Sequence, residues 1–201
     1  MSKFPLPAWQ WSKWMLHVNH YYPHRVKDFA KSFSENQMAA KSWLVEHLKM
    51  HPINDGRPKT VWVLGSWYGT ILIPLLQNNI KNIEIHMVDY DPETLKIAEF
   101  MFDHKVKTHC MDVNFDLEQL EADIIINTSC EHMYPMTDYN FKGLCVFQTN
   151  NFREETAHIN CVDTLDDFKQ QLNMKRIDVA KEMMFHRFDQ KHKRFMIIGE
   201  K

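Results

Sequence analysis

The feature that most limits the folds open to this chain is an alternation, from residue 59 onward, of short apolar runs with stretches of helical periodicity. Strands are predicted for the runs Thr60–Leu64, Ile83–Val88, Val106–Cys110, Asp123–Ile126 and Gly143–Phe147. Runs that are nearly continuously apolar are typical of parallel strands buried on both faces. The pattern therefore predicts an α/β protein with a mostly parallel sheet covered by helices.

The segments between and around these runs complete the architecture. Helices are predicted over Glu35–Met50, with Ser34 as N-cap, and over Thr70–Gln77, Glu93–Phe102 and Asp163–Leu172. An antiparallel closing pair is predicted for Lys181–Phe188 and Arg194–Ile198. The turn-rich connector Pro52–Lys59 separates a helical N-terminal extension, residues 1–55, from a core of residues 59–201. We expect a single domain over residues 1–201.

Composition excludes several classes of protein. With 44% hydrophobic and 25% charged residues, the chain has the make-up of a globular domain rather than a disordered one. The longest apolar stretch, Ile71–Leu76, is too short to cross a bilayer, and the first residues lack the layout of a signal peptide. The four cysteines form no CxxC pair, which favours reduced thiols and a cytoplasmic location. A net charge of −2 gives no overall attraction to nucleic acid.

Glycine is scarce, and its placement is informative. Of the 5 glycines, Gly65 and Gly69 fall in one short window directly after the first predicted strand. Such a pair indicates a backbone that turns tightly or approaches something closely. Backbone amides at a strand-to-helix turn suit the polar tail of a cofactor, such as a carboxylate or phosphate. The alternative is a tight turn that only lets the helix pack closely on the sheet.

Carboxylates follow the second and third predicted strands. Asp89 lies 24 positions beyond Gly65, close to the ~20 expected for an acid that accepts hydrogen bonds from ribose hydroxyls. The alternative for Asp89 is to cap, together with Asp91, the helix that begins at Pro92; we assign that cap to Asp91. Asp112 suits an exocyclic amine such as that of adenine, and equally suits a turn.

The fourth predicted strand runs into the densest cluster of polar side chains in the chain, Asn127 to Met133. His132 titrates near neutrality and suits a general base. Glu131 is placed to orient His132 or to bind a cationic group of a ligand. A nucleophilic role for Cys130 is disfavoured because no separate histidine is tied to it in the sequence. The alternative is a capped loop whose side chains satisfy turn amides.

The order of these segments resembles a known family. The stretches VDYDPETLKIAE, CMDV and ADIIINTSCEHM resemble successive motifs of class I S-adenosylmethionine-dependent methyltransferases, over about Lys59–Phe147. The ending RFMIIG resembles the last, antiparallel strand of that Rossmann-like, seven-stranded fold. GSWYG, NTSCEHM and FQTNNF also resemble small methyltransferase-like proteins of bacteriophages. One departure stands in the first motif, where Trp67 occupies the position of the middle glycine.

The resemblance implies S-adenosylmethionine as cofactor and a set of residues for it. The implied cofactor-binding residues are Gly65, Ser66, Trp67, Gly69, Asp89, Tyr90, Asp112, Val113, Asn127 and Ser129. The glycine turn would meet the methionine part, Asp89 the ribose, and Asp112 with Val113 the adenine. Glu131 and His132 are the catalytic candidates, which position or deprotonate the acceptor. Asn127 is not followed by the Pro-Pro-aromatic sequence of DNA amino-methyltransferases, so methylation of DNA amino groups is not supported.

Three further segments are weighed against plainer alternatives. The aromatic and basic N-terminus suits a lid over a planar substrate, but an ordinary helix packed on the core is favoured. His17, His20 and His24 have a spacing that suggests a metal site, but Pro23 interrupts them, and we expect no metal. Substrate contact or turn formation is expected for the polar residues Gln148, Asn150, Asn151, Arg153, His158 and Asn160. The basic stretch Lys191–Arg194 is assigned to a solvated hairpin turn.

The sequence thus predicts a methyltransferase that acts on a small-molecule or nucleotide-like acceptor. A protein that binds S-adenosylmethionine without methylating, whether it sequesters it, cleaves it or serves a partner enzyme, is the first alternative. A nicotinamide-dependent oxidoreductase is less favoured, because the GxGxxG pattern is missing and because of the position of Asp112.

Overall fold

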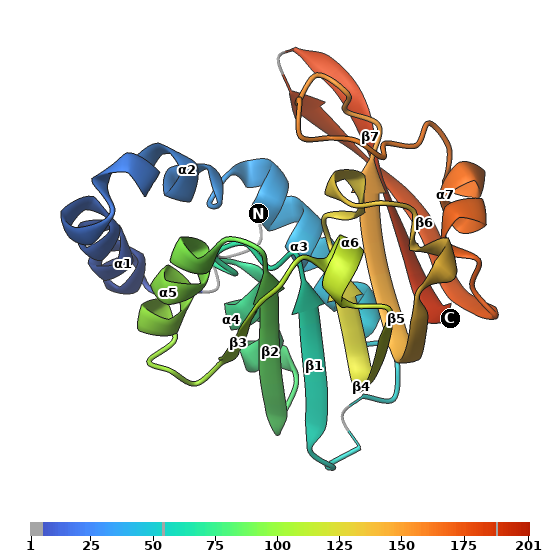
Figure 1. The fold of residues 1–201 in the computed structure, drawn as a ribbon, viewed down its shortest axis with the longest axis horizontal. Coiled ribbons are helices and arrows are strands. Elements are labelled where there is room, and N and C mark those ends of the chain that lie inside the picture. Colours follow the sequence, from blue (N-terminus) through green and yellow to red (C-terminus); the bar gives the residue numbers. More distant parts are fainter. Residues whose placement is uncertain (1–5, 54, 188) are drawn as a thin grey trace.

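A computed structural model describes residues 6–53, 55–187 and 189–201, with a seven-stranded sheet at its centre (Figure 1). The strands are β1 (Lys59–Leu64), β2 (Ile83–Asp89), β3 (Lys107–Cys110), β4 (Gln119–Asn127), β5 (Asn140–Asn150), β6 (Arg176–Arg187) and β7 (Gln190–Glu200). Their order is β3-β2-β1-β4-β5-β7-β6. Strands β1 to β5 pair in parallel, and β7 pairs antiparallel with both β5 and β6. The predicted mostly parallel sheet with a reversed last strand is confirmed.

The helices and turns fill the connections between the strands. They are α1 (Ala8–Tyr21), η1 (Pro23–Arg25), α2 (Val26–Lys31), α3 (Glu35–Leu48), α4 (Leu72–Asn79), α5 (Pro92–Met101), α6 (Val113–Asp116), η2 (Cys130–His132), η3 (Met136–Asp138) and α7 (Leu165–Leu172). Each predicted helix is present with slightly different ends. Helix α7, for example, begins after Thr164, whose hydroxyl forms a capping box with Asp167. Ser34 occupies the N-cap position of α3, but its side chain makes no capping hydrogen bond.

The last two strands differ most from the sequence prediction. The predicted strand Lys181–Phe188 is part of the longer β6, and Phe188 itself lies outside the described residues. The assignment of Lys191–Arg194 to a solvated turn was wrong, because these residues belong to β7 and Arg194 is buried. Lys191 and Lys193 lie where β6 and β7 continue as a hairpin past the end of β5, whereas Arg194 pairs with Asn150, the last residue of β5 (Figure 1).

Two apolar layers cover the sheet. Alternate strand residues such as Val61 and Val63 face α1, α3, α4 and α5, where they join one core cluster. On the opposite face, Phe168 and Leu172 of α7 pack with Phe147 and its neighbours in a second cluster. The alternation follows from the pleat of a strand, which sends successive side chains to opposite faces. Both faces of the sheet are therefore buried in the region of β4, β5 and β7.

The N-terminal helices form a wall beside the carboxyl ends of β1 and β2. Trp14 and Val18 of α1 and Phe29 of α2 are buried in the first core cluster. The Tyr68 hydroxyl donates a hydrogen bond to Asp28 at 2.9 Å. These contacts fix the segment to the core, whereas Trp9 remains 67% exposed.

The histidines of this wall contact neighbouring aromatic and acidic side chains. His17 stacks on Phe100, with 3.5 Å between ring centroids, and the ring of His20 meets Tyr21 edge-on. The Nε2 of His24 lies 2.9 Å from Glu93 Oε2. His17 and His20 both contact the ring of Tyr21, whereas His24 pairs with Glu93, and the three do not form a cluster of metal ligands among the residues described.

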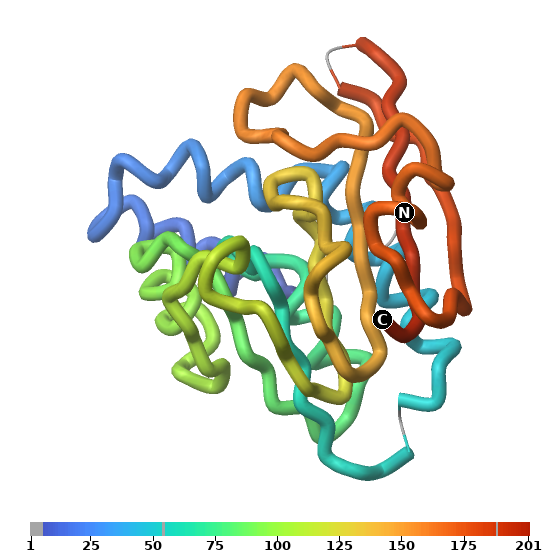
Figure 2. Tube along the Cα trace, turned by 45° about the vertical axis from the view of Figure 1, so that its right-hand side comes forward, coloured from blue at the N-terminus to red at the C-terminus, as the bar shows by residue number. Residues whose placement is uncertain are grey.

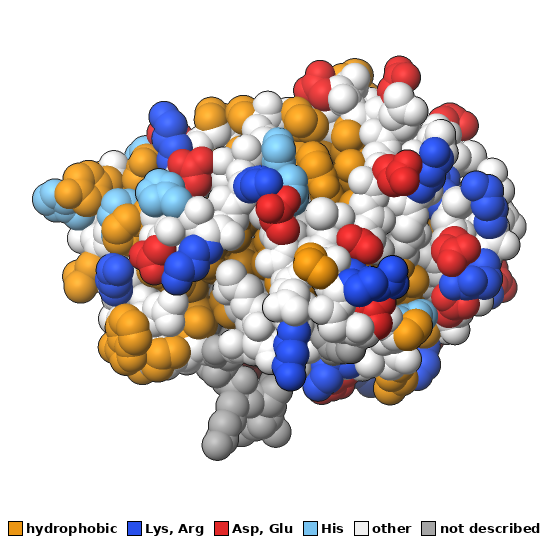
Figure 3. Space-filling model, turned by 90° about the horizontal axis from the view of Figure 1, so that it is seen from below, with side chains coloured by type: hydrophobic (Ala, Val, Ile, Leu, Met, Phe, Trp, Pro, Cys, Tyr) orange, Lys and Arg blue, Asp and Glu red, His pale blue; other side chains and the backbone are white. Residues whose placement is uncertain are grey.

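The surface and the helices carry two further findings. On the face shown in Figure 3, Lys and Arg side chains lie among Asp and Glu side chains instead of gathering in one patch. Within the described part of the chain, every helix is too short or too polar to cross a lipid bilayer.

Arg25 anchors the wall, and its removal tests that role. Its Nη2 lies 2.6 Å from Asp91 Oδ2 and its Nε 2.8 Å from Glu93 Oε2, in a partly buried setting. We expect Arg25→Ala to lower the free energy of unfolding by about 1–3 kcal/mol, since it removes charged hydrogen bonds. The control is Arg57→Ala, which removes an exposed ion pair with Asp55 and should change the value much less. Equal effects in urea denaturation would contradict the anchoring role.

Candidate functional site

The loop between β1 and α4 has left-handed backbone at alternate residues: φ is 58° at Gly65, 49° at Trp67 and 66° at Gly69. Trp67 thus adopts the conformation that a glycine would take most easily, at a cost of roughly 1–2 kcal/mol. A Cβ on Gly65 would lie 2.5 Å from the Met133 side chain, and one on Gly69 would lie 2.6 Å from Ile73. The sequence departs from the three-glycine motif, but the backbone keeps its shape.

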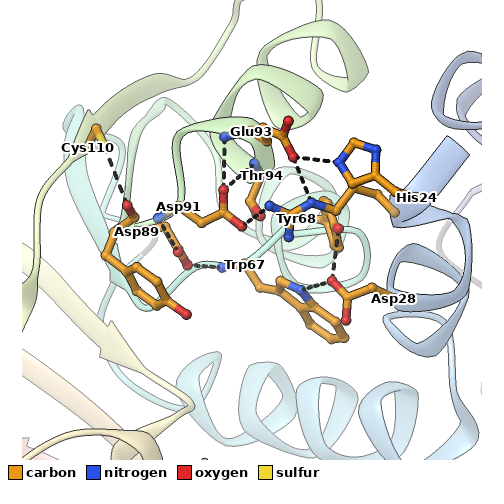
Figure 4. Close-up of polar contacts among 11 residues, drawn as sticks. His24, Asp28, Trp67, Tyr68, Asp89, Asp91, Glu93, Thr94 and Cys110 are labelled. Carbon is orange, nitrogen blue, oxygen red and sulfur yellow. Dashed lines mark hydrogen bonds and ion pairs between the residues drawn. The ribbon is translucent and has the colours of Figure 1, made fainter. Parts of the chain in front are cut away.

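Trp67 is held from the side of the N-terminal wall. Its ring nitrogen Nε1 donates a hydrogen bond to Asp28 Oδ2 at 3.2 Å, as the close-up of this region shows (Figure 4). The same carboxylate oxygen accepts the hydroxyl of Tyr68. The indole ring therefore points towards α2 and away from Asp89, which the backbone of the same residue contacts.

Asp89, at the end of β2, ties two loops together. Its Oδ2 accepts the backbone N–H of Trp67 at 2.8 Å, and its Oδ1 accepts that of Asp91 at 3.1 Å (Figure 4). The residue is only 8% exposed, and burial raises the pKa of its carboxyl group, while the hydrogen bonds from the backbone of Asp91 and Trp67 oppose that rise. Each carboxylate oxygen has a further lone pair, so Asp89 retains the capacity to accept more donors.

The carboxylates that follow β2 and β3, Asp91 and Asp112, both cap a helix. The predicted cap is confirmed, since Asp91 accepts hydrogen bonds from the N–H groups of Glu93 and Thr94 at the start of α5. Asp112 is the N-cap of α6 and accepts the Asn114 N–H at 2.9 Å. Val113 is buried next to it. Asp112 thus makes the turn contact that was one of the two alternatives predicted for it, the other being a contact with an exocyclic amine.

Exposed aromatic rings line this edge of the sheet. Tyr90, after β2, is 76% exposed, and Phe115, on α6, is 70% exposed. Tyr134, beyond β4, is half exposed and meets Phe115 edge-to-face, with ring centroids 6.0 Å apart. Exposed rings at the carboxyl ends of parallel strands suit a planar ligand. Sequence reasoning missed Phe115 and Tyr134, because neither belongs to a motif.

Asn127, at the end of β4, shapes the next loop from within. It is fully buried; its Oδ1 accepts the Ser129 N–H at 2.8 Å, and its Nδ2 lies 3.0 Å from the sulfur of Met133. The Ser129 hydroxyl in turn lies 3.4 Å from the carbonyl oxygen of Gly65. Asn127 therefore places Ser129 against the glycine loop, although its own side chain does not reach a ligand space.

A cavity of about 50 Å³ lies between the glycine loop, the β4 loop and α3. Its lining residues are Ser32, Gln37, Lys41, Gly65, Ser66, Trp67, Gly69, Thr70, Ile71, Leu72, Thr128 and Ser129. The structure thus brings five predicted residues to one space: Gly65, Ser66, Trp67, Gly69 and Ser129. The other predicted residues are not among its lining: Asp89, Tyr90, Asp112, Val113, Asn127, Glu131 and His132.

The size of this cavity limits what fits inside it. A single water molecule needs about 10–15 Å³ of such a cavity, so the space holds a small polar group and not a whole nucleoside. A nucleoside cofactor with its polar tail here would have to lay its sugar and base over the open edge near Asp89 and Tyr90. The left-handed loop beside the cavity and the exposed ring of Tyr90 on the open edge are compatible with a cofactor placed in this way.

Lys41 is a cavity residue that sequence reasoning missed. Burial lowers the pKa of its ammonium group to about 7, the nearby charge of Arg194 lowers it further, and Glu131 opposes both. A signal was present in the sequence. Lys41 falls three residues after Met38 and three before Leu44, on the apolar side of the predicted helix. A lysine on such a stripe is a buried cation or a cavity residue.

Glu131 and His132 turn towards the segment that follows β5. Glu131 is 4% exposed; its Oε1 accepts a hydrogen bond from Asn150 at 2.5 Å, and its Oε2 is buried without a hydrogen-bond partner. His132 keeps an exposed edge, but the protein packed against it lowers its pKa by desolvation, with the charge of Glu131 opposing. Burial also raises the pKa of the Cys130 thiol well above its usual range, which keeps it protonated.

The polar residues predicted after the fifth strand divide in two. Gln148 and Asn150 belong to β5 and are buried, and Gln148 donates to the Ala40 carbonyl oxygen at 3.0 Å. Beyond them, the carbonyl oxygen of Glu131 accepts the N–H groups of Ile159 and Asn160 at 2.9 and 3.0 Å. The loop that follows β5 is therefore fastened to η2 and not to the cavity.

Comparison with known proteins identifies the fold. No family model and no curated protein sequence matches the chain. The structure of Burkholderia thailandensis 1,6-didemethyltoxoflavin-N1-methyltransferase, with bound 1,6-didemethyltoxoflavin and S-adenosylhomocysteine, matches with TM-score 0.58 and 12% identity, over 100% of this chain and 94% of that one. TehB from Haemophilus influenzae matches with TM-score 0.61 and 14% identity, over 85% and 65%. Ribosomal protein L11 methylase from Lactobacillus delbrueckii subsp. bulgaricus matches with TM-score 0.55 and 17% identity, over 84% and 81%.

These likenesses, together with the strand order and the single reversed strand, show that the chain has the Rossmann-like fold of class I methyltransferases. The fold predicted from the motifs is confirmed. The resemblance to bacteriophage proteins stays a prediction, since none of these three structures comes from a bacteriophage.

The lowered pKa of Lys41 has a consequence for stability. Its ordinary pKa is 10.5 and its value in the folded protein is about 7, so between these values the unfolded chain binds more protons. The free energy of unfolding contributed by this group therefore rises with pH from about 7 to 10 and is lowest below pH 7. We expect Lys41→Met to stabilise the protein by at least about 1 kcal/mol more at pH 6.5 than at pH 9.5.

Urea denaturation at both pH values measures this difference. Lys96→Met, at an exposed position of α5, serves as the control and should show no such dependence on pH. A pH-independent effect of Lys41→Met would show that the ammonium group keeps its ordinary pKa.

Proposed function

We propose that this protein is an S-adenosylmethionine-dependent methyltransferase that acts on a small-molecule or nucleotide-like acceptor. The observation that carries the proposal is the left-handed loop of Gly65, Trp67 and Gly69, tied through the Trp67 N–H to Asp89 at the end of the neighbouring strand. In this fold, that pairing joins an amide-rich turn to a ribose-binding acid across adjacent strands.

The cofactor roles follow the positions of the residues. The cavity beside the glycine loop would take the amino-acid end of the cofactor, and Asp89 would accept the ribose hydroxyls with its remaining lone pairs. Tyr90, with Asp112 and Val113, would receive the adenine on the exposed edge. Support comes from the exposure of the Tyr90 ring and from the N-cap position of Asp112 beside it.

Methyl transfer from a sulfonium cofactor needs little covalent catalysis by the protein. A bound sulfonium cofactor supplies an already activated methyl group, so the chain must mainly align the acceptor with it. Ser129, which Asn127 holds against the glycine loop, would line the transfer space. Glu131 and His132 remain the proposed residues for positioning or deprotonating the acceptor. Lys41 lines the cavity with Ser129 and has a pKa of about 7, which suits it to take a proton there as well.

Two measurements test the function. Calorimetry with S-adenosylhomocysteine and with NAD should show binding of the first and none of the second. Incubation with methyl-labelled S-adenosylmethionine and a fractionated cell extract should then transfer label to a small-molecule fraction. Cofactor binding without transfer to any fraction would support a non-methylating cofactor binder, and binding of NAD alone would support an oxidoreductase.

Asp89 provides the sharpest test of the cofactor site. We expect Asp89→Asn to weaken S-adenosylhomocysteine binding about tenfold or more, because it removes the charge that strengthens the ribose hydrogen bonds. Isothermal titration calorimetry measures the affinity. Asp103→Asn, at an exposed position after α5, is the matched control and should leave it unchanged. An unchanged affinity in a folded Asp89→Asn variant would remove Asp89 from the site.

A further inference from the structure

Two segments far apart in sequence bring three metal-binding side chains together. The loop after β5 folds back over η2, and both appear at the upper end of the molecule in Figure 2. Glu131 and His132 come from η2, and His158 comes from the loop. One potential ligand atom from each of the three lies within 4.8 Å of the other two. This cluster is separate from the lining of the cavity.

The two imidazoles are already oriented by backbone carbonyls. Nδ1 of His132 lies 3.1 Å from the carbonyl oxygen of Ala157, and Nδ1 of His158 contacts that of Phe152. A carbonyl oxygen only accepts, so both Nδ1 atoms carry the proton and both Nε2 atoms carry the lone pair. Metal-binding histidines are typically fixed in this way, with one ring nitrogen donating to the protein and the other left for the ion.

Glu131 supplies a carboxylate with one oxygen to spare. Asn150 holds its Oε1, while its Oε2 is buried and has no hydrogen-bond partner. A buried carboxylate oxygen without a partner is costly and unusual in a folded protein. Two imidazoles with free lone pairs lie nearby, so a metal ion bound by them would also give this oxygen a partner.

We propose that Glu131, His132 and His158 form a binding site for a divalent transition-metal ion. Donor atoms about 2.1 Å from one ion lie roughly 3–3.5 Å apart, so a cluster within 4.8 Å closes by shifts of about an ångström. The site offers three protein ligands, and the exposed edge of His132 leaves further coordination positions to solvent or to a ligand.

The surroundings select the kind of ion. Lys41 and Arg194 are cationic residues that interact with Glu131, so their positive charge would repel a metal ion that was held by charge alone. Imidazole nitrogen binds zinc, cobalt, nickel and iron well, whereas magnesium and calcium prefer sets of oxygen ligands. Two imidazoles and one carboxylate therefore favour the first group.

A metal ion here would fasten the loop after β5 to η2. Without the ion, the loop is held by the Ile159 and Asn160 amides on the Glu131 carbonyl oxygen and by the His132 contact with Ala157. An ion here would take the Nε2 lone pair of His132, so His132 could then position an acceptor but not deprotonate it. The site does not depend on cofactor binding, so its failure and the failure of the proposed methyltransferase function are distinguishable.

Metal titration of the full chain tests the site. After treatment with a chelator, calorimetry with Zn²⁺ and visible absorption with Co²⁺ should show one ion bound per chain, and Zn²⁺ should raise the melting temperature. His132→Ala and His158→Ala should each weaken Zn²⁺ binding by about tenfold or more, as the loss of one of three ligands requires. His20→Ala, at an exposed position of α1, is the matched control and should bind Zn²⁺ as the unchanged chain does.

A second histidine pair must be distinguished from this site. His86 Nδ1 and His109 Nε2 lie 2.9 Å apart, and their rings stack on Trp62. Loss of Zn²⁺ binding in His86→Ala, with retention in the folded His132→Ala and His158→Ala variants, would overturn the proposal. So would the failure of the unchanged chain to bind either ion. Circular dichroism of each variant confirms that it is folded.

Discussion

The buried carboxylate of Asp89 holds together the edge of the sheet on which the site is built. It accepts one backbone N–H from the loop after β1 and another from the loop after β2. Asp91, whose amide takes part, caps α5 with its side chain and pairs with Arg25 of the N-terminal wall. Because a buried charge needs hydrogen bonds, separation of these loops would leave the Asp89 carboxylate buried without its two backbone donors, which is unfavourable.

Much of the fold could be predicted because the central parallel strands are nearly continuous apolar runs, as in VWVL of β1 and III of β4. The ends of the strands could not. Strands β4 and β5 begin at Gln119 and Asn140, which pair with each other through the backbone and carry no apolar signal. Lys191–Arg194 was assigned to a turn for the same reason: these side chains are polar, yet Arg194 pairs with Asn150 at the end of β5, and the residues before it pair with β6 alone.

The candidate site shows the same limit in another form. Gly65, Asp89 and Ser129 could be found from the sequence because each follows a strand, and the ends of parallel strands meet at one edge. The position of Lys41 on the apolar side of α3 marked it as unusual, but nothing in the sequence says that α3 lies over that edge. His158 joins Glu131 only through loop hydrogen bonds, for which no spacing rule exists.

Trp67 gives the glycine loop a dependence that a third glycine would not. Its left-handed backbone is unfavourable for a bulky residue, and its ring is anchored to Asp28 on α2. The energetic penalty of the turn is thus offset by an attachment some forty positions earlier in the chain. In this protein the N-terminal helices act as a brace for the loop, so a version of the core stripped of them would carry the motif without the support that keeps its amides aligned.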